Sequence, residues 1–89
     1  MESTEEIIGK YVAVRCSEGA AYTGKVERYD SHLVLTEAYN VIEWGTERGF
    51  GQLAVSGKTA STVLGACGTC FIPAHAVITI MPCKTQLKS

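Results

Sequence analysis

The sequence predicts a small, mainly β domain in which five short strands form a strongly bent barrel. Residues 11–16 alternate so that apolar side chains fall on one face, which is typical of a half-buried strand. Gly24 lies within the next apolar segment, where a glycine favours a sharp bend. The chain then turns at Asp30 and starts another apolar run at Leu33, as in a hairpin.

Composition and charge limit what this chain can be. Its 89 residues predict a single domain over 1–89. A chain of this size buries only roughly 60–65% of its unfolded surface, so self-association would stabilise it by burying more. The 46% apolar and 19% charged residues exclude a disordered chain. The net charge of −1 excludes nucleic-acid binding by bulk electrostatics, so any such binding has to be local, through stacking and hydrogen bonds.

The sequence predicts a cytoplasmic protein without a membrane segment. Its first six residues are acidic on balance, and no apolar signal-peptide core follows them. No apolar run approaches the roughly 20 residues that a membrane helix needs. We therefore expect the four cysteines to be thiols and not disulfides.

The first elements follow from capping signals and turn residues. A short helix is expected at about 3–9, where Ser3 can cap the first turn, Glu6 completes a capping box and Gly9 ends the helix. The first two strands are expected at residues 11–16 and 21–29, and a turn at 17–19 is expected to join them.

A third strand and a long variable loop are expected in the middle of the chain. The strand runs from Leu33 to about Tyr39, and Val41–Trp44 either continues it or forms a short hairpin with Phe50–Val55. Glycine, serine, threonine and alanine dominate the variable loop, about 41–66. We interpret this loop as irregular with short β extensions, and not as a helix.

The last two strands are expected near the C-terminus. They lie at 68–72 and 76–81, a tight turn at 73–75 joins them, and the polar tail 83–89 is expected to fray. A barrel this small leaves edge strands. Head-to-tail contacts between copies would pair strand four of one copy with strand five of the next and so form a ring.

Two motifs suggest a known family. In the first half, glycines, an aromatic residue and an aspartate fall in register: Gly9-Lys10-x-Val12, Glu18-Gly19, Gly24-x-Val26-x-x-Tyr29-Asp30 and Leu33-Val-Leu-x-x-Ala38. Near the C-terminus stands Ile72-Pro-Ala-His-Ala-Val-Ile-Thr-Ile-Met-Pro82. These stretches resemble the first Sm motif (about 9–39) and the second Sm motif (about 67–82) of the Sm and Sm-like (Lsm) proteins and their bacterial relative, the RNA chaperone Hfq.

The resemblance implies a short N-terminal helix on a five-stranded, bent Sm-like barrel that assembles into a ring of five to eight subunits. Rings of this family bind single-stranded, often U-rich, RNA around the pore. The turn after strand two and the turn before strand five supply side chains that stack on and read the base, and an Arg or Lys closes the pocket. This fits the general chemistry of single-strand recognition. No cofactor is implied.

These two turns contain four candidate RNA-binding residues: Asp30, Ser31 and His32 on one wall and His75 on the other. His32 either stacks on a base or is a solvated turn histidine. Asp30 either orients His32 or a base edge, or it stabilises the turn by accepting hydrogen bonds from backbone N–H groups. Ser31 offers a small hydroxyl. His75 either lines the pore or supports the turn that begins at Pro73.

The chain departs from the family pattern at two kinds of position: the one whose side chain reads the base and the one whose cation closes the pocket. Aligned without a gap, Val34 stands where Sm proteins carry the uracil-reading Asn. Pro73-Ala74 replaces the Arg-Gly of Sm proteins and the Tyr-Lys of Hfq, although His75 remains. Three aromatic residues near the variable loop form either a second stacking surface or packing beneath the loop: Tyr39, Trp44 and Phe50.

The cysteines and the lack of acid–base motifs argue against a metal site and against an enzyme. Cys67-x-x-Cys70, with Cys16 and Cys83, supplies enough thiols for zinc. Residues three apart on a strand, however, point to opposite faces, and no helix N-terminus or cation favours a reactive thiol. We therefore expect these cysteines to pack as small hydrophobic residues. The sequence contains no phosphate loop, Ser-His-Asp spacing or paired-carboxylate arrangement.

The sequence thus favours a homo-oligomeric Sm-like ring that binds single-stranded, U-rich RNA at its pore and acts in RNA processing or chaperoning. The alternative is an Sm-fold ring that has lost RNA binding and serves as a structural or protein-interaction module. The neutral charge and the missing Asn and Arg favour that alternative. A zinc-binding module through the cysteines is the third hypothesis.

Overall fold

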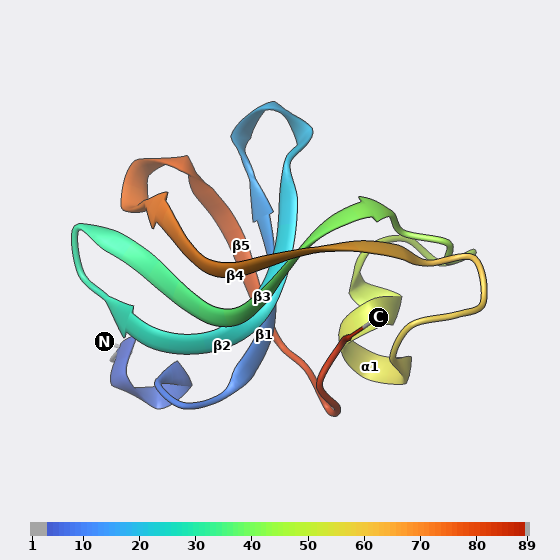
Figure 1. Cartoon of the computed structure of the whole chain (residues 1–89), viewed down its shortest axis with the longest axis horizontal. Coiled ribbons are helices and arrows are strands. Elements are labelled where there is room, and N and C mark those ends of the chain that lie inside the picture. Colours follow the sequence, from blue (N-terminus) through green and yellow to red (C-terminus); the bar gives the residue numbers. More distant parts are fainter. Residues whose placement is uncertain (1–3, 89) are drawn as a thin grey trace.

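Five antiparallel strands form one strongly bent sheet in the computed structural model, which describes residues 4–88. The sheet order is β4-β3-β2-β1-β5, so β4 and β5 lie at its two edges (Figure 1). The strands have the following bounds: β1 Tyr11–Cys16, β2 Ala21–Tyr29, β3 His32–Glu43, β4 Val63–Pro73 and β5 Val77–Pro82. The predicted mainly β class is confirmed, and β1 and β2 have the predicted bounds.

Gly24 lies where β2 bends across β3. A Cβ atom at this position would lie 3.0 Å from the Thr36 carbonyl oxygen and 3.1 Å from the Ala38 Cα. The pairing register of β2 with β3 shifts between Thr23 and Lys25, on either side of this glycine. The bend predicted from Gly24 is confirmed, and its cause is a backbone approach that a residue without Cβ permits.

The N-terminal segment forms a single turn of 3-10 helix, Thr4–Ile7, where a helix is expected over about 3–9. One turn makes few internal hydrogen bonds, so contacts with the sheet hold this segment in place. Ile7 packs against the core, and the Gly9 N–H donates to a β2 carbonyl at 2.8 Å. The predicted cap, Ser3, lies outside the described residues.

The segment expected to be a variable loop contains a helix. Helix α1 spans Gly51–Ser56 and buries Leu53 and Ala54 against the sheet. Gly57 ends it with φ of 83°, and the Gly57 N–H donates to the Leu53 carbonyl at 3.0 Å. The prediction that residues 41–66 hold no helix is therefore wrong. The alternative in which Phe50–Val55 forms a strand is also wrong. The buried side chains stabilise a helix too short to form alone.

Strands β3 and β4 are longer than predicted and pair along most of their length. Their register runs from His32 opposite Pro73 to Glu43 opposite Val63. Of the two predictions for residues 41–44, continuation of the third strand is confirmed as far as Glu43. The register shifts at bulges in the middle of the pair, where Glu37 has φ of 51° and Gly68 has φ of 76°.

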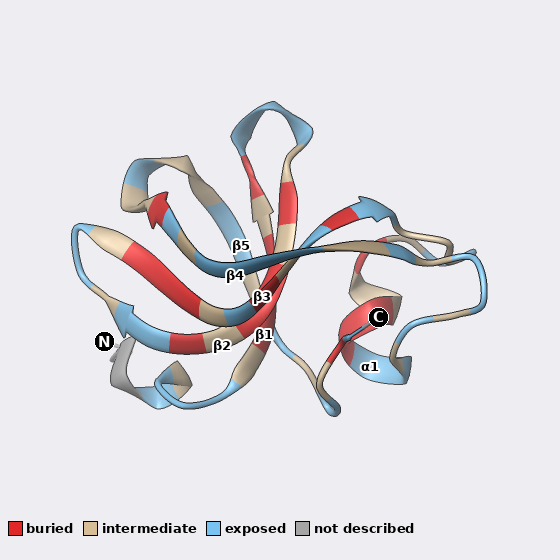
Figure 2. Cartoon of the chain, viewed as in Figure 1, coloured by how far each residue is buried: buried red, intermediate tan, exposed pale blue. Residues whose placement is uncertain are grey.

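Two clusters of buried side chains form the core (Figure 2). The first lies within the bend of the sheet and contains Val12, Val14, Cys16, Val26, Leu33, Leu35, Ala38 and Ile72. The second joins the sheet to α1 and to the C-terminal tail and contains Ala13, Ala21, Val41, Phe50, Leu53 and Leu87. Cys16, at 4% exposure, packs as the small hydrophobic residue that was expected.

The C-terminal tail packs against α1, so the prediction that residues 83–89 fray is wrong for the described part of the tail. Leu87 is 2% exposed within the second cluster. The Lys84 N–H donates to the Ala54 carbonyl at 2.9 Å. The Gln86 side-chain amide donates to the Glu37 carboxylate at 3.1 Å. One buried leucine and two hydrogen bonds thus fix a segment whose composition is otherwise polar.

Both edge strands expose large apolar side chains. Phe71 on β4 is 62% exposed, and Ile78 on β5 is 65% exposed. Among the described strands, β4 pairs with β3 alone and β5 with β1 alone. Exposed apolar edges of this kind favour pairing with a further strand. None of the helices described within residues 4–88 has the length and hydrophobicity needed to cross a bilayer.

Candidate functional site

The structure joins the two turns that carry the predicted site residues. His32 at the start of β3 lies opposite Pro73 at the end of β4. The Ala74 N–H, in the turn between β4 and β5, donates to the Ser31 carbonyl at 3.0 Å. Both turns therefore lie at the same end of the domain, away from α1 (Figure 1). The structure therefore brings together the two turns that carry the candidate residues.

Asp30 stabilises the turn between β2 and β3. Its Oδ1 accepts a hydrogen bond from the His32 N–H at 3.3 Å, and its own N–H donates to the His32 carbonyl at 3.1 Å. The His32 N–H, with smaller contributions from Arg28 and the Ser31 backbone, lowers the pKa of the Asp30 carboxyl below its usual value. The carboxylate thus stabilises the turn, as the structural interpretation of Asp30 expects, while its side chain stays more than half exposed.

Arg28 brings a cation to this turn that the sequence reasoning did not include. Its Nε lies 3.0 Å from Asp30 Oδ2, and both side chains are more than half exposed. The pair occupies positions two apart near the end of β2, and alternate residues of a strand share a face. This two-residue spacing was the sequence signal from which the ion pair of Arg28 with Asp30 could have been found. The site therefore carries a guanidinium even though Pro73 and Ala74 replace the family's closing cation.

His32 is half-buried at the edge of the turn, and one of its two ring nitrogens makes a hydrogen bond within the domain. The Ser31 hydroxyl and His32 Nδ1 form a hydrogen bond of 3.2 Å. The other ring nitrogen has no hydrogen bond from the described side chains. The arrangement can therefore present an imidazole, oriented by Ser31, for stacking or for a hydrogen bond to a base edge.

His75 lies in a short 3-10 turn, Ala74–Ala76, and is exposed. The turn predicted at 73–75 is confirmed. The described residues provide His75 with no hydrogen bond to His32, so the two imidazoles belong to neighbouring turns without contacting each other through a polar bond.

The aromatic residues near α1 are packed within the domain. The Trp44 and Phe50 rings have centroids 5.3 Å apart and are inclined by 54°, and Phe50 is 4% exposed. The Arg15 guanidinium carbon lies 5.0 Å from the Trp44 ring centroid, in a cation–π contact. Since Trp44 contacts Arg15 as well as Phe50, the packing interpretation of these aromatics agrees with the structure better than the stacking-surface interpretation.

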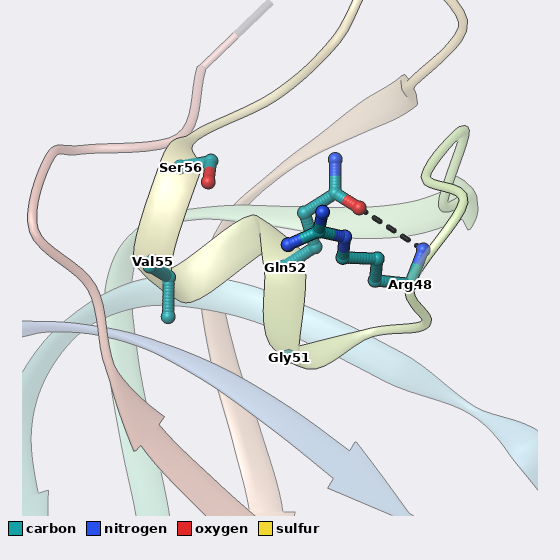
Figure 3. A pocket seen from close by; sticks show the side chains of 5 residues that line it. All are labelled: Arg48, Gly51, Gln52, Val55 and Ser56. Atoms are coloured by element: carbon teal, nitrogen blue, oxygen red, sulfur yellow. Dashed lines mark hydrogen bonds between the residues drawn. The ribbon is translucent and has the colours of Figure 1, made fainter.

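A hollow of about 230 Å³ lies on the outer side of α1, lined by Arg48, Gly51, Gln52, Val55 and Ser56 (Figure 3). The Arg48 N–H donates to Gln52 Oε1 at 3.0 Å, which ties the preceding loop to the helix. None of the predicted site residues lines this hollow. It lies at the end of the molecule opposite to the two joined turns (Figure 1).

Cys16 lies on β1, Cys67 and Cys70 lie on β4, and Cys83 follows β5. Within residues 4–88, no three or more His, Cys, Asp or Glu side chains gather as a metal site would require. Burial, followed by the neighbouring Cys67, raises the pKa of the Cys70 thiol to about 11. The bulge at Gly68 breaks the strand alternation on which the prediction depended.

Comparison with known proteins identifies the fold. No protein-family model and no curated protein sequence matches the chain. A heptameric archaeal Sm protein matches it with a TM-score of 0.62 at 21% identity, covering 88% of this chain and 91% of that one. The P. aerophilum SmAP1 heptamer matches with a TM-score of 0.64 at 20% identity, over 91% and 88% of the two chains.

Two further solved structures agree with this result. The Sm-like protein AF-Sm2 from Archaeoglobus fulgidus matches with a TM-score of 0.60 at 21% identity, over 92% of this chain and 96% of that one. A chain of the NatC complex bound to CoA matches with a TM-score of 0.58 at 19% identity, over 94% and 88%. The chain therefore has an Sm-like fold, as its two sequence motifs predict.

Proposed function

We propose that copies of this chain assemble into a ring and that the ring binds single-stranded, U-rich RNA in a role in RNA processing or chaperoning. One observation carries the proposal. The β2–β3 turn is joined to the β4–β5 turn, so that Asp30, Ser31, His32 and His75 lie at one end of an Sm-like domain. The archaeal Sm proteins of this fold are heptamers, which supports a ring here without fixing its subunit number.

The edge strands support assembly by head-to-tail contact. Phe71 on β4 and Ile78 on β5 are exposed apolar side chains on strands that lack a second partner within the described chain. The two edges differ in sequence, so a contact between them is heterologous and repeats until the ring closes. Ring closure would bring the joined turns of successive subunits around one axis.

The chemistry of the turns suits weak recognition of single strands. His32 would stack on a base, Ser31 and Asp30 would contact base edges or sugar hydroxyls, and Arg28 would contact a phosphate. Val34 supplies no amide to read uracil, and Asp30 neutralises part of the Arg28 charge. We therefore expect modest affinity with a shallow dependence on salt.

The second candidate is an Sm-fold subunit that contacts proteins and binds no RNA. The specific observation in its favour is the ion pair of Arg28 with Asp30, which ties the one cation of the β2–β3 turn to a carboxylate. The likeness to a chain of the NatC complex supports the idea that this fold also serves within protein assemblies.

Binding of fluorescently labelled oligouridine at low salt tests the first candidate. We expect a rise in fluorescence anisotropy with the parent protein. His32→Ala should weaken binding about five-fold or more, since stacking on one base contributes ~1–3 kcal/mol. Arg28→Ala should weaken binding and lower the salt dependence by about one phosphate contact.

Arg48→Ala is the matched control, because Arg48 is an exposed cation on the α1 side of the molecule. It should leave binding unchanged. Equal losses in Arg28→Ala and Arg48→Ala would indicate unspecific attraction and contradict the site. If the parent protein assembles but binds none of the RNA homopolymers, the RNA-binding candidate is contradicted and the protein-interaction candidate is favoured.

A further inference from the structure

The charges of this chain are divided unevenly along its length. Residues 1–47 contain all nine acidic side chains, whereas residues 48–89 contain none. Four of the eight basic residues lie in this second part, and all four side chains are exposed: Arg48, Lys58, Lys84 and Lys88. Within residues 4–88, no carboxylate lies within ion-pair distance of any of these four cations.

Docking of the tail gathers the four cations around α1. The Lys84 N–H donates to the α1 backbone at 2.9 Å, and Lys88 follows the buried leucine of the tail. Lys58 follows the end of α1 by two residues. Positive charges outnumber negative ones at this end of the domain even when the three acids that precede α1 or contact the tail are counted, namely Glu37, Glu43 and Glu47. Such a charge excess attracts ligands of the opposite sign.

The hollow beside α1 is lined by one of these cations and presents hydrogen-bond donors. Gln52 Oε1 accepts the Arg48 N–H at 3.0 Å, so the amide nitrogen of Gln52 remains as a donor. Figure 3 shows the Arg48 side chain folded back over the helix, with its guanidinium beside Gln52. Within the described part of the chain, the Arg48 guanidinium, Gln52 Nε2 and the Ser56 hydroxyl have no hydrogen-bond partner. The hollow thus offers donors from three side chains, and no carboxylate lines it.

Val55 gives the same hollow an apolar side. It is 61% exposed, although it lines the hollow together with the three donor side chains. A guanidinium binds a carboxylate through two parallel N–H···O bonds, and neutral donors can bind the remaining lone pairs of its oxygens. A cation, two neutral donors and an aliphatic side chain therefore suit a carboxylate on a short carbon chain, which is the form of Asp and Glu side chains.

We propose that the α1 end of the domain binds an acidic protein segment, and that one carboxylate of this segment lies in the hollow. Arg48 pairs with the carboxylate, and Gln52 Nε2 and the Ser56 hydroxyl donate to its oxygens. The exposed Lys58 and Lys84 attract the neighbouring acidic side chains of the partner. The site uses no residue of the two joined turns, so it does not depend on whether those turns bind RNA.

A protein segment suits this end better than a nucleic acid does. Single-strand recognition uses exposed aromatic rings on which successive bases stack. Here Phe50 is 4% exposed, and the half-buried Trp44 contacts both Phe50 and Arg15. Four separate cations also supply few phosphate contacts. The end with the positive excess therefore lacks the stacking surface that a base would need.

Fluorescence anisotropy with a labelled peptide tests the proposal. The peptide carries several glutamates around one leucine and has blocked ends, and a second peptide carries glutamine in place of glutamate. The parent protein should bind the glutamate peptide at low salt and should not bind the glutamine peptide. Arg48→Ala should weaken binding about five-fold or more, because a charge-assisted pair is lost. Arg48→Lys should keep only part of the affinity, since a lysine cannot make two parallel bonds to one carboxylate.

Lys10→Ala is the matched control. Lys10 is an exposed cation beside the N-terminal turn, on the side of the domain away from α1 (Figure 1). This variant should bind the glutamate peptide as the parent does. Equal losses in Lys10→Ala and Arg48→Ala, or equal binding of the two peptides by the parent protein, would overturn the proposal. Displacement of the bound peptide by oligouridine would assign the surface to nucleic acid and overturn it as well. A parent protein that does not bind the glutamate peptide contradicts the proposal without any variant having to fold.

Discussion

The absence of one Cβ atom at Gly24 sets how closely β2 and β3 approach each other. An added Cβ would meet the Thr36 carbonyl oxygen, the Ala38 Cα and the Leu35 Cβ at 3.0–3.1 Å. Two of these neighbours are backbone atoms, which cannot rotate away as the end of a side chain can. The bend at the centre of the domain therefore tolerates no side chain at this position without movement of a strand.

Gly24→Ala should lower the free energy of unfolding by about 1–3 kcal/mol, the usual range for overpacking. Urea denaturation measures this. Gly51→Ala is the control, because a Cβ there meets only the Met81 sulfur at 3.7 Å and alanine gains up to about 1 kcal/mol of helix propensity. Unchanged stability of Gly24→Ala would mean that the bend does not depend on this glycine.

Single residues are predictable from the sequence where their role depends on near neighbours. The bend at Gly24 and the turn bonds of Asp30 are of this kind, and the ion pair of Arg28 with Asp30, although not predicted, also joins near neighbours. The bulge of β4 at Gly68 is different, because its position is set by pairing with β3 and no local pattern specifies it.

At the scale of elements, α1 and the C-terminal tail stabilise each other. The helix has six residues, too few to be stable in isolation. Leu53 and Leu87 belong to one buried cluster, and the Lys84 N–H donates to the Ala54 carbonyl. We therefore expect the position of the helix over the sheet to depend on the docked tail.

Leu87→Ala should lower the free energy of unfolding by about 2–4 kcal/mol, because removing a buried leucine leaves a cavity. Val55→Ala is the control on the same helix, where a side chain that is 61% exposed should change stability by less than about 0.5 kcal/mol. Hydrogen exchange of the Gly57 amide, which is bonded to Leu53, should quicken in Leu87→Ala. Parent-like stability of Leu87→Ala would show that the tail is not docked in solution.

Elements were predictable where alternation or turn residues mark them. The bounds of β1 and β2 follow from such patterns, whereas α1 does not. Gly51–Ser56 contains a glycine and a serine and has no cap side chain bonded to its first turn, so nothing local indicates a helix. Its stability comes from Phe50 and Leu87, which lie in the same cluster but far apart in the sequence.

At the scale of the whole molecule, two features point toward assembly. The chain is small, and its two sheet edges carry exposed Phe71 and Ile78. Its net charge of −1 offers little repulsion between copies. The sequence predicted both edge strands but not which side chains they expose, because that depends on the registers of β4 against β3 and of β5 against β1.

Light scattering should give the parent protein a mass several times 9.5 kDa. Phe71→Lys and Ile78→Lys should each reduce this measured mass sharply, because a charge at the centre of a strand-to-strand contact is poorly solvated. Val55→Lys is the matched control, since Val55 is as exposed as Phe71 but lies on α1. A monomeric parent protein at micromolar concentration would contradict the ring.

A mixture of the two variants separates head-to-tail contact from symmetric contact. Phe71→Lys keeps an intact β5 edge, and Ile78→Lys keeps an intact β4 edge. If β4 of one copy pairs with β5 of the next, the mixture should form a dimer through the two intact edges, although each variant alone is a monomer. If each edge instead pairs with its own kind, each variant alone would remain dimeric through its intact edge, which would contradict a head-to-tail ring.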